Sequence, residues 1–571
     1  MATGDATIPV PSIGWATTLA SLLLWTAASL PAEAAPSARV FVLDPGAPAL
    51  VSVDLAAGKR LASLPLEGQP TWLVQSDDGR YLVALDYGPG EDKGDRGWKA
   101  EGRSSATIVD ASRFAIIGRV ELGFGLDSVL TGPDGRLTVT CPGYDAKKSD
   151  DALPRELVVV DLATARERGR LRIDPGTDLT WRSPDGRTLA LLLGLPRSKK
   201  YPWPEARTTI VDVESVSVTA TLDSAGWDQV ERDEERLYLI DFGEPDKNPK
   251  KNENGSVEVI SFAERRVDRL DLGRAPVAGL LGEDGLFAVA SEGPAGGLGG
   301  ELRFIRKGAL VTVLPVAARP MWLGEVRENL CVVGSKAVTF VDPEALQVTA
   351  TIPLERGGKG VVDDDDRPFE VLATADGRRA FIHYPAQDKV AVLDLEQSKA
   401  IGSTKTGRGK KKFFNAMLSG LTYGASEKVY FYRPGGPPQM LLRPDGRYAY
   451  ALNLDTSDVT VVDADTAAAV EKIGAGGRML ALLGGSTLAV LGSELHLIDT
   501  ARNAKVGEIQ LPRLQGFRRS ADGSYAVALT EGTVLILDGT TGQERARLVD
   551  FVNPTRMAFA KDGEASEPTT P

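Results

Sequence analysis

Histidine and cysteine are nearly absent from this 571-residue chain, which contains two of each. His383 and His496 stand in different repeats, which excludes zinc, copper or di-iron sites built from several histidines. Cys141 and Cys331 occupy the same kind of strand in two distant repeats, so we expect two free, buried thiols. Scarce histidine also disfavours catalysis, since histidine is the most frequent catalytic acid–base group.

Cofactor motifs are missing as well. The sequence contains no glycine-rich phosphate loop after a strand, no Cys-x-x-Cys pair and no haem-attachment motif. The consecutive acids Asp363–Asp366 lack the alternating ligands and the turn-forming glycine of a calcium loop, so they indicate a solvated loop. We therefore expect no cofactor and no bound metal.

A positive net charge is lacking too. The formal charge of −12 argues against nucleic-acid binding, which needs a basic face, and the 42% hydrophobic share is that of a soluble globular protein.

Long apolar runs are confined to the first 35 residues. The stretch Trp15–Leu30 and the small residues Ala32 and Ala34 predict a secretory signal over residues 1–35, although this segment has no basic residue.

The alternative for this segment is an uncleaved membrane anchor. A run of 16 residues is shorter than the roughly 20 that span a bilayer, so cleavage is favoured. We expect an exported protein, periplasmic or extracellular, without stable membrane insertion after signal removal. The polar tail 564–571 is expected to be disordered.

A repeated cassette of about 48 residues fills the rest of the chain. Most copies have an Asp-Gly turn, then alternating apolar and polar residues, then a strand that ends on aspartate, and three copies have a degenerate turn. This alternation predicts four short antiparallel strands per copy. The turns are Asp78-Gly79, Asp134-Gly135, Asp185-Gly186, Asp284-Gly285, Asp376-Gly377, Asp445-Gly446, Asp522-Gly523 and Asp562-Gly563.

Such a period with four strands is typical of a β-propeller blade. About eleven blades exceed the usual four to eight, so two interlocked propellers, residues 36–316 with long inserts and residues 317–563, are favoured over one oversized ring. The first copy lacks an innermost strand, and Thr555–Ala560 supplies one without a blade of its own. We therefore predict that Thr555–Ala560 pairs with Val40–Asp44.

The cassette resembles that of the YVTN-type β-propeller repeat proteins. Ser183–Arg187 matches the Ser-Pro-Asp-Gly-Arg turn, Tyr450–Asn453 approximates the namesake tetrad, and Val459–Asp463 matches the aspartate-ended strand. Gly68–Pro70 and Gly273–Pro276 resemble the Gly-x-x-Pro lead-in. The resemblance covers nearly all of residues 38–563 and implies the fold, but not a function.

Long inserts fall between the second and third strands of a blade or between blades. In a propeller these connections open on one face, where function usually lies. Aromatic and basic side chains in the inserts form the candidate binding face, although they could instead anchor the loops. Its residues are Trp98, Tyr144, Tyr201, Trp203, Lys410, Lys411 and Lys412.

Two functions remain open. The first is an exported propeller that binds or scaffolds a protein, peptide or glycan partner in the cell envelope. The second is a propeller enzyme, such as a lactonase, lyase or quinone-dependent oxidoreductase, acting at the channel mouth. The scarcity of histidine favours the binding protein. A deep pocket at the channel mouth with convergent acids and arginine or tyrosine would favour the enzyme.

Overall fold

Antiparallel β-strands make up the fold. The computed structural model describes residues 38–92, 98–143, 154–173, 179–193, 206–224, 227–233, 235–242, 254–282, 284–293, 299–354, 370–407, 439–454, 456–484 and 486–561. All of these lie in one compact unit, Ala38–Pro571. The helical structure within them is the single turn η4, Pro385–Gln387. The predicted signal and tail lie outside the described residues.

Nine four-stranded sheets and one seven-stranded sheet carry the described chain. In sheet order, the first five are β45 (Arg556–Phe559), β1 (Arg39–Asp44), β2 (Ala49–Asp54), β3 (Lys59–Pro65); β4 (Pro70–Gln75), β5 (Tyr81–Asp86), β8 (Ser105–Asp110), β9 (Ala115–Glu121); β10 (Ser128–Thr131), β11 (Arg136–Cys141), β12 (Glu156–Asp161), β13 (Arg166–Arg172); β14 (Leu179–Arg182), β15 (Thr188–Leu193), β16 (Arg207–Asp212), β17 (Ser217–Asp223); and the seven strands β18 (Gln229–Arg232), β19 (Arg236–Asp241), β20 (Asn254–Ser261), β21 (Arg266–Leu281), β22 (Leu286–Glu292), β23 (Gly300–Arg306), β24 (Ala309–Val316).

The remaining sheets follow in the same order along the chain. They are β25 (Pro320–Val326), β26 (Asn329–Gly334), β27 (Ala337–Asp342), β28 (Gln347–Pro353); β29 (Glu370–Ala373), β30 (Arg379–Tyr384), β31 (Lys389–Asp394), β32 (Lys399–Lys405); β33 (Met440–Leu442), β34 (Tyr448–Asn453), β35 (Asp458–Asp463), β36 (Ala469–Ile473); β37 (Met479–Gly484), β38 (Thr487–Leu491), β39 (Glu494–Asp499), β40 (Ala504–Gln510); and β41 (Gly516–Arg519), β42 (Tyr525–Thr530), β43 (Thr533–Asp538), β44 (Glu544–Leu548). A separate hairpin joins β6 (Gly90–Asp92) and β7 (Trp98–Ala100).

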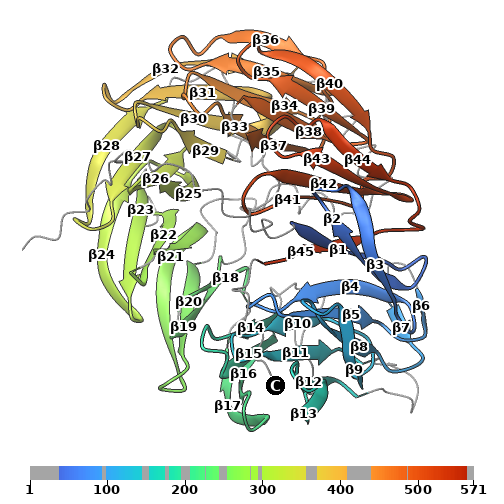
Figure 1. Cartoon of the computed structure of the whole chain (residues 1–571). Helices are drawn as coiled ribbons and strands as arrows, with labels where there is room; N and C mark the ends of the chain where they lie inside the picture. The colour runs from blue at the N-terminus through green and yellow to red at the C-terminus, as the bar shows by residue number, and fades with distance from the viewer. Residues whose placement is uncertain are drawn as a thin grey trace, which may run out of the picture. The chain divides into compact units, whose positions relative to one another are not determined.

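Each four-strand unit has the same burial profile, and we call the unit a blade. Its second and third strands are almost wholly buried, as in β5 and β8, whereas its fourth strand is mostly exposed, as in β9. First strands of neighbouring sheets contact one another, as β25 does β29 and β29 does β33. Figure 1 shows these first strands nearest the centre of the arrangement, so the first strand of a blade is innermost. This repeated arrangement of radially packed four-stranded units is a β-propeller.

The seven-stranded sheet contains two blades that share β21. Its first part pairs with β20 up to Arg274, and its last residues, Ala278–Leu281, pair with β22. The outermost strand of one blade therefore runs directly into the innermost strand of the next.

Hydrophobic clusters join each blade to the one that follows it in the chain. Phe304 and Val332, for example, share a cluster across residue 316, where the sequence predicted a division. Phe41 and Leu82 join the first blade to the second, and Val53 with Ile536 joins the first blade to the last. The two interlocked rings expected from the sequence are not confirmed, because the packing crosses the proposed boundary without interruption.

The predicted pairing of the two ends is confirmed. β1 pairs with β45 in antiparallel register, with Val40 opposite Phe559 and Val42 opposite Met557. Figure 1 shows β45, in red, beside β1, in blue. The buried Asp44 carboxylate accepts hydrogen bonds from the backbone amides of Val552 (2.8 Å) and Asn553 (2.7 Å). This pairing gives the first blade its innermost strand. We call the junction of β1 and β45 the seam.

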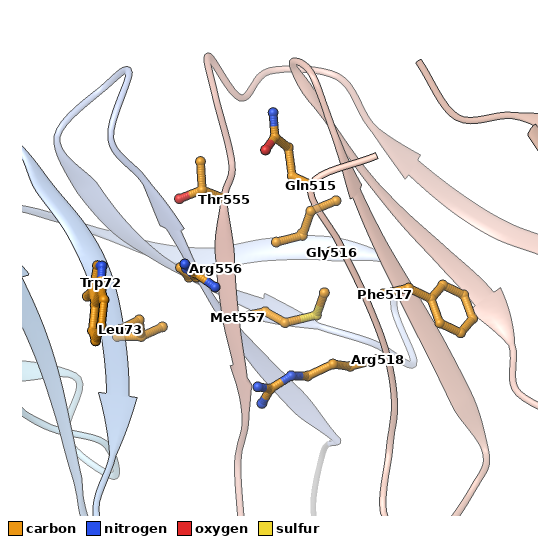
Figure 2. A pocket seen from close by; sticks show the side chains of 10 residues that line it. Trp72, Leu73, Gln515, Gly516, Phe517, Arg518, Thr555, Arg556 and Met557 are labelled. Carbon is orange, nitrogen blue, oxygen red and sulfur yellow. The ribbon is translucent and has the colours of Figure 1, made fainter. Parts of the chain in front are cut away.

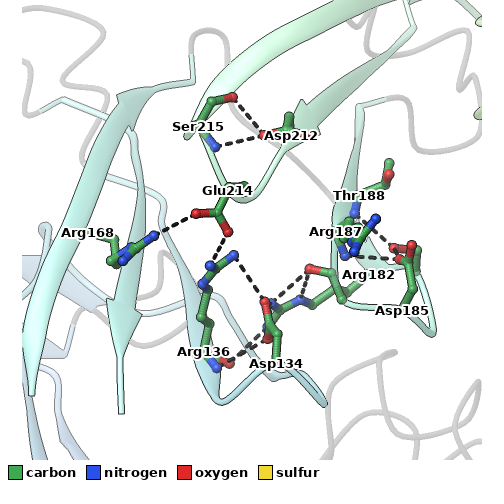
Figure 3. A network of polar contacts seen from close by, with 12 residues as sticks. Asp134, Arg136, Arg168, Arg182, Asp185, Arg187, Thr188, Asp212, Glu214 and Ser215 are labelled. Carbon is green, nitrogen blue, oxygen red and sulfur yellow. Dashed lines mark hydrogen bonds and ion pairs between the residues drawn. The ribbon is translucent and has the colours of Figure 1, made fainter. Parts of the chain in front are cut away.

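Polar contacts also link blades on the side of the Asp-Gly turns. The buried Arg182 guanidinium, on β14, donates to both carboxylate oxygens of Asp134 at 2.7 and 2.8 Å and to the carbonyl of Arg136 at 2.9 Å. Glu214, from the β16–β17 turn, accepts from Arg136 and Arg168. Figure 3 shows this network between the blades of β10–β13 and β14–β17.

Both cysteines are free and buried, as predicted. Burial raises the pKa of the Cys141 thiol to about 11 and also raises the pKa of Cys331. Both histidines lie in strands, His383 in β30 and His496 in β39, as the alternation indicates. Among the described residues, no helix has the length and apolar character needed to cross a membrane.

Candidate functional site

A pocket opens on the innermost strands at the seam. Its volume is about 260 Å³, and its walls come from β4, β41 and β45, which belong to the second, last and first blades. Figure 2 shows these three strands side by side around the pocket. The lining residues are Trp72, Leu73, Gln515, Gly516, Phe517, Arg518, Leu529, Thr555, Arg556 and Met557.

Two arginines give the pocket a positive character. Arg518 on β41 and Arg556 on β45 are both exposed, and neither forms a hydrogen bond or ion pair within the described part of the chain. Figure 2 places both guanidinium groups between β4 and β41. In a protein with a net charge of −12, two neighbouring arginines without acidic partners favour an anionic ligand.

Polar and apolar groups complete the wall. The Thr555 hydroxyl is inaccessible to solvent and has no hydrogen-bond partner, and Gln515 adds an exposed amide. Trp72 is half-buried and packs edge-on against Tyr87, with ring centroids 6.2 Å apart. Met557 is buried in the cluster between the first and last blades. The pocket thus combines an indole face with donors, the combination that small binding sites use for orientation.

Among the described residues, the lining of this pocket contains no aspartate, glutamate, histidine, lysine, cysteine or tyrosine. General acid–base catalysis needs one of these groups within hydrogen-bond reach of the reacting atom. Arginine stays protonated at every accessible pH, so it binds anions but does not shuttle protons. The two arginines of the pocket therefore suit the binding of an anion.

A carboxyl group with a raised pKa lies on another innermost strand. Burial raises the pKa of Glu370, at the start of β29, to about 7, although backbone amides near the start of β33 oppose the shift. Its carboxylate accepts a hydrogen bond from the backbone amide of Met440 at 2.8 Å. Because its hydrogen-bond donors are backbone amides of the adjoining blade, this group links two blades.

One group of described residues could hold a metal ion. Glu494, His496 and Glu508 lie on β39 and β40, the two outer strands of their blade. Burial and the nearby Lys505 lower the pKa of His496, so the imidazole is neutral near pH 7 and able to act as a ligand. None of these residues lines the seam pocket.

Most residues of the predicted binding face fall outside the described part of the chain. These are Tyr144, Tyr201, Trp203, Lys410, Lys411 and Lys412. Trp98 begins β7. In the chain, the β6–β7 hairpin lies between β5 and β8, and these two strands are the second and third of their blade. Whether these seven residues form one face stays a prediction.

The seam pocket could not be predicted from the sequence, because its residues come from three distant segments of the chain. Trp72 stands more than 400 residues before Gln515 in the chain. The predicted pairing of Thr555–Ala560 with Val40–Asp44 was the available clue, since it brings the last strand next to the first blade.

No protein-family model and no curated protein matches the chain. Solved structures with some likeness include apo AztD from Citrobacter koseri, at 10% identity over 92% of this chain and 98% of that one, with a TM-score of 0.30. BamB from Moraxella catarrhalis has 12% identity over 56% and 87% of the two chains, with a TM-score of 0.30.

A third structure is the dihydro-heme d1 dehydrogenase NirN in complex with DHE. It has 15% identity over 72% of this chain and 75% of that one, with a TM-score of 0.31. All of these scores are below 0.5, so the fold assignment rests on the sheets and their packing, and no function is transferred.

Proposed function

We propose that the chain is an exported binding protein of the cell envelope, built as a single ring of eleven blades. Its seam pocket binds a carboxylate group of a peptide or protein partner. The proposal rests on Arg518 and Arg556, two arginines without acidic partners in the described chain, which line one pocket beside Trp72. Arginine recognises carboxylates in a bidentate manner, and the indole ring adds apolar contact area.

The packing of the blades supports a single ring. Nine four-stranded sheets and the two blades that share β21 give eleven blades in the described chain, and clusters link each to the next and the last to the first. The sequence resemblance to YVTN-type repeat proteins agrees with such repetition. The inserts on the predicted binding face would extend the contact with a partner beyond the pocket.

The enzymatic alternative finds less support. An enzyme at the channel mouth was expected to bring acids together with arginine or tyrosine, whereas the lining of the seam pocket includes arginine without an acid or a tyrosine. A glycan partner with a carboxylate-bearing sugar would use the same two arginines.

A titration with a labelled hexaglutamate peptide tests the proposal. We expect the full chain to bind this peptide and not hexaglutamine. Replacement of Arg518 or Arg556 by Gln is expected to weaken binding by about tenfold each, because each substitution removes a charge-assisted hydrogen bond. The matched control is Arg513→Gln, an exposed arginine that pairs with Glu531 outside the pocket.

Equal affinity in the wild type and in the double variant Arg518→Gln/Arg556→Gln would overturn the proposal. Binding of a uronate oligosaccharide but not of the peptide would assign the pocket to a glycan instead.

Export has its own test. Mass spectrometry of the protein purified from the envelope fraction is expected to find the N-terminus at Ala35, because Ala32-Glu33-Ala34 forms a small-x-small cleavage site. An N-terminus at Met1, or a protein found only in the cytosol, would contradict export.

A further inference from the structure

A cluster of ionisable side chains lies at the outer strands β39 and β40, away from the seam pocket. Glu494 and His496 are two residues apart on β39, so their side chains share one face of the sheet. Glu508 on β40 stands directly opposite His496 in the register. The pleat and the register thus bring one imidazole and two carboxylates together.

Both carboxylates are oriented toward the imidazole. The Oε2 atom of Glu494 lies 3.3 Å from Nε2 of His496, and the Oε2 atom of Glu508 lies 3.5 Å from Nδ1. The Oε1 atoms of both glutamates accept hydrogen bonds from the Gln510 side-chain amide, at 2.8 and 3.3 Å. One amide therefore holds the two carboxylates so that their other oxygens face the histidine.

The histidine itself is buried and incompletely bonded. The His496 side chain is 7% exposed, and its Nδ1 atom is shielded from solvent without a hydrogen-bond partner. A buried imidazole nitrogen of this kind is costly unless a proton or a cation satisfies it. The two glutamates are about one-third exposed, at 36% and 38%, so an ion could reach the cluster from solvent.

We propose that Glu494, His496 and Glu508 form a binding site for a divalent transition-metal ion of the zinc type. Nitrogen and carboxylate oxygen are the ligands that zinc accepts, with bonds of about 2.0–2.2 Å. A tetrahedron with such bonds separates its ligand atoms by about 3.4 Å. The three ligand atoms here lie within 4.8 Å of one another, so a tetrahedral site requires only small rotations of the two partly exposed glutamates.

The imidazole can use only one nitrogen as a ligand. Each of the two nitrogens has a glutamate Oε2 atom within 3.5 Å, so either nitrogen can bind an ion that the carboxylates also bind. Three protein ligands leave a fourth position for water or for a group of a partner.

A resident cation already competes for the site. The Lys505 ammonium contacts the Oε2 atom of Glu508, so a metal ion must displace it from this oxygen. Removal of the ammonium should therefore strengthen metal binding. This expectation distinguishes a metal site from a histidine that only links two glutamates by hydrogen bonds. In the second case, removal of the ammonium would not strengthen metal binding.

Equilibrium dialysis of the full chain against Zn²⁺, together with Co²⁺ absorption spectra, tests the inference. We expect His496→Gln and Glu494→Gln each to weaken Zn²⁺ binding by about tenfold or more. Lys505→Met is expected to tighten it at least threefold, since a competing cation is lost. The control is Glu544→Gln on β44, an outer-strand carboxylate that pairs with Arg547.

Circular dichroism of each variant establishes that it is folded. If His496→Gln unfolds, Glu494→Gln still tests the site, because it changes a partly exposed side chain. Zn²⁺ binding that is unchanged by Glu494→Gln and by Lys505→Met would overturn the inference. Loss of binding in Glu544→Gln to the same degree as in Glu494→Gln would do so as well, because binding would then be non-specific.

Discussion

Aspartate ends the third strand of most blades because its side chain forms the turn that follows. The Asp538 carboxylate accepts backbone hydrogen bonds from Thr540 (3.0 Å) and Thr541 (2.8 Å), and Asp110 does the same for Ser112 and Arg113. Four residues after the aspartate the backbone enters the left-handed region, as at Gly542 (φ 71°). Asparagine and aspartate favour such turns because their short side chains reach the backbone two or three residues on.

The same side-chain chemistry forms the Asp-Gly turns. Ser520 donates its hydroxyl to Asp522 at 2.6 Å, and the backbone amide of Ser524 donates to the same carboxylate at 3.0 Å. These hydrogen bonds lower the pKa of Asp522 to about 2. A carboxyl with a lowered pKa stabilises the folded state above its ordinary pKa of 3.8. This contribution is lost as the pH falls from about 4 toward 2.

At the seam, Asp44→Ala should destabilise the protein by about 3 kcal/mol. The substitution removes two hydrogen bonds from the backbone amides of Val552 and Asn553 to the buried carboxylate, and each hydrogen bond to a charged group contributes about 1.5 kcal/mol or more. Chemical denaturation measures the change. The control Asp54→Ala removes an exposed turn contact with Ala57 and should cost about 1 kcal/mol. Equal effects of the two substitutions would contradict the role of Asp44 at the seam.

Glu370 predicts a specific pH dependence. Its pKa is raised from 4.5 to about 7 in the folded protein, so the folded state prefers the protonated carboxyl. Its contribution is fully present below pH 4.5 and is lost as the pH rises to about 7, by up to about 3 kcal/mol. In Glu370→Gln the group no longer titrates. The stability difference between variant and wild type should therefore grow in favour of the variant between pH 4.5 and 7, and a constant difference would refute this account.

At the scale of elements, the contact between Arg182 and Asp134 joins two blades. Arg182→Met should cost about 3 kcal/mol, because it removes the buried partner of Asp134 and the donors to two backbone carbonyls. Thermal unfolding followed by circular dichroism measures the loss. The neighbouring exposed Arg187→Met should change stability by about 0.5 kcal/mol or less. A loss in Arg187→Met that matches the loss in Arg182→Met would show that the buried pair has no special importance.

Strands and turns could be predicted from the sequence because both signals are local. Alternation around Tyr448–Asn453 and the turn at Asp445-Gly446 gave β34 and its preceding turn directly. The continuous strand β21 was harder to predict from the sequence. It links two blades at Arg274 because β20 pairs with its first part and β22 with its last part. The group formed by Glu494, His496 and Glu508 also needs the strand register, which the sequence does not specify.

At the scale of the whole molecule, the closure of the fold could be predicted from the sequence, whereas the number of rings stays a prediction. An innermost strand left over at the C-terminal end has one partner, the incomplete first blade, and β45 occupies that place. The change of insert length near residue 316 suggested two rings, and the cluster that joins Phe304 with Val332 across this boundary does not confirm them.

The seam pocket depends on that closure, since its walls come from both ends of the chain. A direct measurement is therefore the oxidation of a variant with Val40→Cys and Phe559→Cys, which are paired across β1 and β45. Directly opposite residues are about 4.5–5.5 Å apart at Cα, within the range of a disulfide. The control pair, Leu43→Cys with Phe559→Cys, is three residues out of register and about 10 Å apart.

The account predicts an intramolecular disulfide in the folded monomer, found by peptide mapping between positions 40 and 559, and no such bond in the control pair. Free thiols at both positions, or disulfides only between separate chains, would contradict a ring closed by its first and last strands.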